Sequence, residues 1–85
     1  MDVKELFDFW DQLLAHDMLS VERVVAKCPD PNTILAAEVA AAEDVEHYDS
    51  RPMDREEREN RNALAEQRDV LHEAWKIATD KQLGI

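Results

Sequence analysis

The chain has 85 residues, of which 45% are hydrophobic and 35% are charged, and this balance predicts a folded protein, because a disordered chain has too few apolar groups to offset its backbone entropy. Its 20 acidic and 10 basic residues give a formal net charge of −10, which disfavours binding to nucleic acid or to anionic membranes, since their phosphates are bound through Lys and Arg. A single cysteine excludes an internal disulfide, and a single glycine, at the penultimate position, excludes a glycine-rich phosphate-binding loop.

The amino-acid usage also predicts the fold class and the domain organisation. Alanine, leucine, glutamate and arginine are frequent and glycine is nearly absent, which is typical of helices. A chain of this length forms one unit, so we expect a single helical domain over residues 1–85. No stretch approaches about 18 apolar residues, and the acidic N-terminus lacks the basic region of a secretory signal. We therefore expect a soluble, cytoplasmic protein, and the lone Cys28 suits a reducing compartment.

The first predicted helix runs from about Asp2 to Asp17. Asp2 is suited to be its N-cap, with Glu5 three residues on, because carboxylates are favourable at the positive end of a helix. Apolar residues then follow the alternating spacing of three and four that forms one helical face. The predicted core face consists of Val3, Leu6, Phe7, Trp10, Leu13 and Leu14. Phe9 lies beside this face, where it either widens the buried surface or stands exposed for binding.

A proline break separates a short second helix, over residues 20–27, from a longer third helix, over residues 30–48. Pro29 and Pro31 end the short helix, because proline lacks a backbone N–H and restricts the residue before it. Pro31 also suits the first turn of the next helix, where a missing N–H has no consequence. The predicted N-caps are Ser20 and Asp30. The predicted core face of the third helix is Leu35, Val39, Ala42 and Val45, on an alanine-rich body.

The fourth predicted helix starts at Asp54, which is suited to be its N-cap with Glu57 three residues on, and continues to about Gln82. Its first turns are almost wholly polar, and we expect i,i+4 pairs of Asp54 with Arg58 and of Glu57 with Arg61 to support them. Its apolar face comes later and consists of Leu64, Val70, Leu71, Ala74, Trp75, Ile77 and Ala78. The N-terminal end should therefore project past the core. Together the elements predict an all-α fold, a small helical bundle of three main helices with a short extra helix before a proline kink.

Residues with catalytic or metal-binding chemistry are few. The segments DVEH (44–47) and DVLH (69–72) each place an aspartate and a histidine on adjacent turns of one helical face. Dimetal helical bundles use a comparable pairing, but with glutamate and with further inward-facing glutamates, so the set here is incomplete. Cys28 has Lys27 on one side and only acids on the other, which favours a buried structural thiol over a nucleophile. We therefore predict a protein that is not an enzyme, with no cofactor and no metal site.

The charge distribution points to a protein partner. Residues 28–50 carry six acids and no Lys or Arg, whereas residues 51–85 carry eight acids and seven bases. The helices around Pro29 are arranged like a helix-turn-helix, but the second of them has no basic residue to neutralise phosphates, so direct nucleic-acid binding is not expected. An acidic helix of this kind either mimics spaced phosphates and attracts a basic protein or is only a solvated face. The predicted partner-binding residues are Glu38, Glu43, Asp44, Glu46, Asp49 and Phe9.

Two hypotheses on function follow. The first is an acidic inhibitor or adaptor that docks on a basic site of a nucleic-acid-handling protein, as a nucleic-acid mimic or a phage-type inhibitor does. The second is a self-associating structural or assembly subunit, a homo-oligomer in which the helices pack against copies of themselves. The thin stripe around Val39 and Ala42 and the polar overhang over residues 54–62 motivate this second hypothesis.

Overall fold

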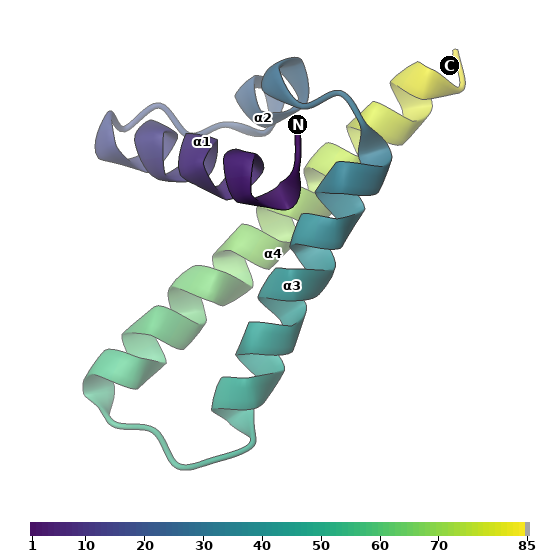
Figure 1. Cartoon of the computed structure of the whole chain (residues 1–85). Coiled ribbons are helices and arrows are strands. Elements are labelled where there is room, and N and C mark those ends of the chain that lie inside the picture. Colours follow the sequence, from purple (N-terminus) through teal and green to yellow (C-terminus); the bar gives the residue numbers. More distant parts are fainter. Residues whose placement is uncertain (85) are drawn as a thin grey trace.

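Four α-helices make up the fold in the computed structural model, which describes residues 1–84 (Figure 1). In chain order they are α1 (Val3–Ala15), α2 (Val21–Lys27), α3 (Pro31–Asp49) and α4 (Arg55–Gln82). No strand occurs among these 84 residues, so the predicted all-α class is confirmed. The predicted arrangement of three main helices with a short one before the prolines is also confirmed.

Each helix begins at a side chain that caps it. In every case a side-chain oxygen accepts a hydrogen bond from a backbone N–H two or three residues later, which satisfies one of the free donors of the first turn. The pairs are Asp2 with Glu5 at 2.8 Å, Ser20 with Arg23 at 3.2 Å, Asp30 with Asn32 at 3.0 Å and Asp54 with Glu57 at 2.9 Å. All four predicted N-caps are therefore confirmed.

The helices α3 and α4 form a long antiparallel hairpin, and α1 and α2 lie across one half of it (Figure 1). The contact between α3 and α4 is the most extensive in the protein; α2 packs on α4, and α1 packs on α3. The other half of the hairpin extends away from α1 and α2, and the molecule measures 45 × 27 × 19 Å. As predicted, the N-terminal end of α4 projects past the core, but it is accompanied by the C-terminal part of α3.

The core lies where all four helices meet. Leu6, Ile34 and Leu71 are fully buried, and each comes from a different helix. The remaining buried apolar residues are Trp10, Leu13, Val24, Val25, Cys28, Ala37, Ala41, Val45, Ala74 and Ala78. Many of those on α3 and α4 are alanines, whose small side chains let two helix backbones approach closely.

The predicted core face of α3 is wrong for two of its four residues. Leu35 and Val39 are 40% and 48% exposed, Ala42 is half-buried and only Val45 is buried. The buried face consists instead of Pro31, Ile34, Ala37, Ala41 and Val45. The prediction favoured the larger side chains, whereas α3 packs its alanine side against α4 and turns the larger residues outward.

One residue of the predicted α1 face is also misplaced. Leu6, Trp10 and Leu13 are buried and Val3 and Phe7 are partly buried, but Leu14 is 55% exposed. The reason is that α1 crosses the hairpin instead of lying along it, so that its last turn extends to the side of α3 and α4 (Figure 1).

Two ion pairs hold the projecting half of the hairpin, one between α3 and α4 and one between the connecting turn and α4. Arg61 Nε lies 2.9 Å from Asp49 Oδ1, and Arg51 Nη2 lies 2.8 Å from Glu57 Oε2. The expected pairs within α4, Asp54 with Arg58 and Glu57 with Arg61, are therefore not the ones that form. Arg61 and Glu57 bind residues outside their own helix, because the end of α3 and the turn that follows it lie beside them.

Candidate protein-docking surface

One face of α3 points away from the rest of the protein and has two chemically different halves. Leu35 and Val39 form its apolar half, and Glu43 and Glu46 form its acidic half. Successive members of this set are three or four residues apart, so they lie on adjacent turns of one helical face. All four are exposed. We call this set the outer surface of α3.

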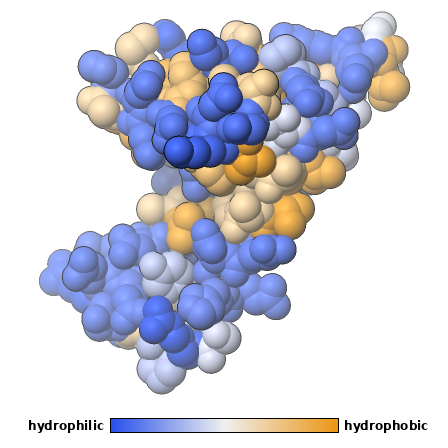
Figure 2. Space-filling view, in the orientation of Figure 1, coloured by the Kyte–Doolittle hydropathy of each residue, from blue (hydrophilic) through white to orange (hydrophobic). Residues whose placement is uncertain are grey.

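One face of the molecule has an apolar band across the middle of the hairpin. Figure 2 shows apolar side chains gathered between the half that carries α1 and α2 and the strongly hydrophilic projecting half. Contiguous exposed apolar patches that are rimmed by polar residues are typical of protein interaction sites.

The structure divides the predicted acidic residues into three groups. Glu43 and Glu46 lie on the outer surface, and within residues 1–84 neither they nor Asp44 form an ion pair. Asp44 is exposed too, but it is two residues from Glu46 and therefore points about 160° away from it around the helix. Glu38 and Asp49 are both engaged within the protein. The six predicted partner-binding residues thus do not form one surface.

Glu38 and Asp49 link α3 to α4. Glu38 Oε1 lies 2.8 Å from His72 Nδ1, and only 17% of the Glu38 side chain is exposed. Asp49 accepts two hydrogen bonds from Arg61, at 2.9 Å and 3.2 Å, in a forked geometry. The Arg61 hydrogen bonds hold the pKa of Asp49 below its ordinary value, and they raise the pKa of Arg61 in turn. These carboxylates therefore support the hairpin.

Phe9 lies on a different surface. It is partly buried and lines a groove of about 400 Å³ between α1 and α2. The groove is lined by Phe9, Leu13, Met18, Arg23, Ala26 and Lys27, and we call it the α1–α2 groove. Lys27 Nζ lies 5.7 Å from the centroid of the Phe9 ring, a cation–π contact.

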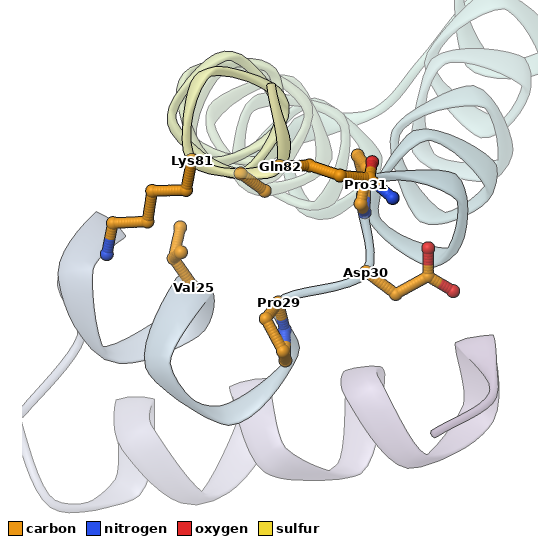
Figure 3. A pocket seen from close by; sticks show the side chains of 7 residues that line it. Val25, Pro29, Asp30, Pro31, Lys81 and Gln82 are labelled. Carbon is orange, nitrogen blue, oxygen red and sulfur yellow. The ribbon is translucent and has the colours of Figure 1, made fainter. Parts of the chain in front are cut away.

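A second hollow, of about 450 Å³, lies between the proline break and the end of α4 (Figure 3). Val25 and Ala78 contribute almost fully buried side chains, and Pro29 is at the margin. The Asp30 carboxylate points away from Val25 and Pro29, because it caps α3. Lys81 lies on the opposite side, on α4. The two titratable residues of this lining, Asp30 and Lys81, thus lie on opposite sides of the hollow.

The residues considered for metal binding or nucleophilic chemistry are not assembled into a site. Within residues 1–84 no group of three or more His, Cys, Asp and Glu side chains is placed to hold a metal ion. Asp69 binds the neighbouring Arg68, and His72 binds Glu38. Cys28 is buried, and this burial raises the pKa of its thiol, which disfavours the reactive thiolate.

Comparison with known proteins gives no relative for this chain. No protein-family model matches it, and no curated protein and no solved structure is significantly similar to it. Among the described residues, none of the helices combines the length and the apolar character needed to span a membrane.

The sequence analysis placed Leu35 and Val39 in the core and so missed the apolar half of the outer surface, although the sequence contains a signal for it. Leu35 and Val39 continue the same turn-by-turn spacing as Glu43 and Glu46, so a mixed apolar and acidic face can be read from the sequence. The competing face through Ile34, with the alanines after it, is equally periodic. Only the packing partner of α3 decides which face is buried.

Proposed function

We propose that this chain is a non-enzymatic protein-binding module that docks a basic partner on the outer surface of α3. The partner's segment would carry apolar residues beside Lys or Arg, and the module would act as an inhibitor or adaptor at the basic site of a nucleic-acid-handling protein. The observation that carries the proposal is the exposure of Leu35 and Val39 directly beside Glu43 and Glu46, which form no ion pair within residues 1–84.

The two halves of the surface would have different roles. Carboxylates that lack an internal partner attract a basic protein and set its orientation, mainly by raising the association rate. Burial of the exposed leucine and valine supplies affinity that carboxylates alone do not, at about 25 cal/mol for each Å² of apolar surface removed from water. A surface that mimics only phosphates would be acidic throughout, so the mixed composition favours recognition of an amphipathic protein segment.

The experiment is affinity capture from a cell extract with the wild-type chain and with Glu43→Lys/Glu46→Lys. The matched control is Asp8→Lys/Asp11→Lys, which makes the same charge change at the same spacing on exposed positions of α1. We expect a basic protein that is retained by the wild type and the control, is lost with the α3 variant, and is released as salt is raised. Retention of the same proteins by all three chains would refute the proposal.

A further inference from the structure

The α1–α2 groove carries the charge opposite to that of the outer surface of α3. Its lining contains two cations, Arg23 and Lys27, and no carboxylate. Within residues 1–84 neither cation forms an ion pair, although the chain has twice as many acids as bases. Glu5 and Asp8 line the next hollow, which shares Phe9 and Lys27 with the groove.

Like the outer surface of α3, the groove combines apolar side chains with charged ones. Met18, 43% exposed, lies in it together with Phe9 and the buried Leu13. Arg23 and Lys27 are four residues apart on α2, so they lie on adjacent turns of one face, about 6 Å apart along the axis. The groove therefore has apolar side chains with two cations beside them. The outer surface of α3 has apolar side chains followed by two carboxylates that lie one turn apart.

We infer that the outer surface of α3 in one copy of the chain docks in the α1–α2 groove of a second copy. A helix laid between two helices buries its apolar residues in the groove, as amphipathic helices do in other complexes. Leu35 and Val39 meet Phe9 and Met18, and the α3 carboxylates meet Arg23 and Lys27. The contact is head-to-tail, because the two surfaces differ. This inference uses the same outer surface as the proposed function, but it needs no foreign partner.

The association is weak for two reasons. A stable interface buries about 800 Å² on each partner, which is roughly a seventh of the 5724 Å² surface of this chain, and four side chains on one helix face cover less. Each copy also has a net charge of −10, and this repulsion is screened only beyond about 8 Å at physiological ionic strength. We expect a dissociation constant on the order of 100 µM.

Sedimentation of charge-reversed variants, alone and mixed, tests the inference. Arg23→Glu/Lys27→Glu makes the groove acidic like the α3 surface, and Glu43→Lys/Glu46→Lys makes the α3 surface basic like the groove. Each variant alone should be monomeric at about 1 mM, tenfold above the expected dissociation constant. An equimolar mixture should associate at least as strongly as the wild type, because every docking surface again meets its opposite. Arg55→Glu/Arg58→Glu, on exposed positions of α4, is the control and should associate like the wild type.

Circular dichroism of each variant verifies that its helices are intact. We expect them to be, because all the substituted residues are exposed. A wild-type chain that is monomeric at about 1 mM overturns the inference, and so does a mixture that stays monomeric while the wild type associates. A wild type that captures its basic partner but remains monomeric overturns the self-association alone. A chain that associates as described but captures no basic protein overturns only the proposed function.

Discussion

His72 on α4 and Glu38 on α3 lie 2.8 Å apart, from Nδ1 to Oε1, and the His72 ring stacks on Trp75 with centroids 5.9 Å apart. The residues are 34 positions apart in the chain, so the contact fixes the relative position of the two hairpin helices. It also changes the role of Glu38, which sequence analysis assigned to a free acidic surface. Glu38 instead binds within its own chain.

A double-mutant cycle tests this contact. Glu38→Ala and His72→Ala should each lower the free energy of unfolding, and the double variant should lose less than the sum, by roughly 0.5–1 kcal/mol for a hydrogen bond that is partly exposed to solvent. Urea unfolding followed by circular dichroism gives the free energies, and Trp75 fluorescence should change in the His72 variant because its stacking partner is lost. Strict additivity of the two single variants would mean that the contact contributes nothing to stability.

A matched pair of substitutions on α1 tests the position of the core. Leu6 is fully buried, so Leu6→Ala should lower the free energy of unfolding by about 2–5 kcal/mol, through lost burial and a cavity. Leu14 is 55% exposed, so Leu14→Ala should lower it by about 0.5 kcal/mol or less. The same chemical change on the same helix is thus expected to differ several-fold in urea unfolding. Equal losses would place Leu14 in the core, as the sequence pattern alone predicted.

The sequence predicts those structural features that depend on residues close together in the chain. The N-caps Asp2, Ser20, Asp30 and Asp54 were predicted correctly, because a cap depends on a few neighbouring residues and on its own side chain. The proline break was predicted for the same reason. These local signals were enough to give the four helices and the class of fold.

The candidate site was predicted only in part, because it depends on which face of α3 meets α4. Ile34 and Leu35 begin two competing faces, and the face that packs against α4 is the one that carries Ile34, Ala37 and Ala41. Likewise, the pairing of Asp49 with Arg61 joins two helices across a turn, and no spacing rule within one helix indicates it. Acidic composition therefore pointed to α3, but tertiary packing leaves Glu43 and Glu46 exposed and engages Glu38 and Asp49 within the protein.

The buried thiol gives a third prediction, on reactivity. Burial raises the pKa of Cys28 above its ordinary value of 9.0, and a hydrogen bond with the Asp30 backbone opposes this only in part. At about pH 8.5 we expect alkylation by iodoacetamide to be at least tenfold slower in the folded protein than in urea. A folded-state rate equal to that in urea would show that the thiol is accessible.

The same shift has a consequence for stability at high pH. Because the folded-state pKa lies above the ordinary value, the unfolded chain loses the thiol proton first as the pH rises. The contribution of Cys28 is then fully present below pH 9.0 and is lost as the pH rises through the folded-state pKa. Cys28→Ala should remove this part of the alkaline loss of stability, and an unchanged alkaline profile in that variant would contradict the assignment.

The pairing of Asp49 with Arg61 gives a prediction at the acidic end of the pH range. The pKa of Asp49 lies below its ordinary value of 3.8, chiefly because Arg61 donates hydrogen bonds to the carboxylate. The unfolded chain therefore binds a proton at this residue before the folded one does as the pH falls. The contribution to the free energy of unfolding is fully present above pH 3.8 and is lost as the pH falls through the folded-state pKa. The stability difference between the wild type and Asp49→Asn should be greatest near neutral pH and should shrink towards about pH 2.

The cause of that pH dependence can be tested in a second background. In Arg61→Ala the carboxylate has lost the donor that lowers its pKa, so adding Asp49→Asn should change stability by an amount that depends far less on pH. Urea unfolding of the four chains at several pH values between about 2 and 7 measures this, and salt should weaken the coupling because both side chains are partly exposed. If the pH-dependent difference persists without Arg61, another group lowers the pKa of Asp49.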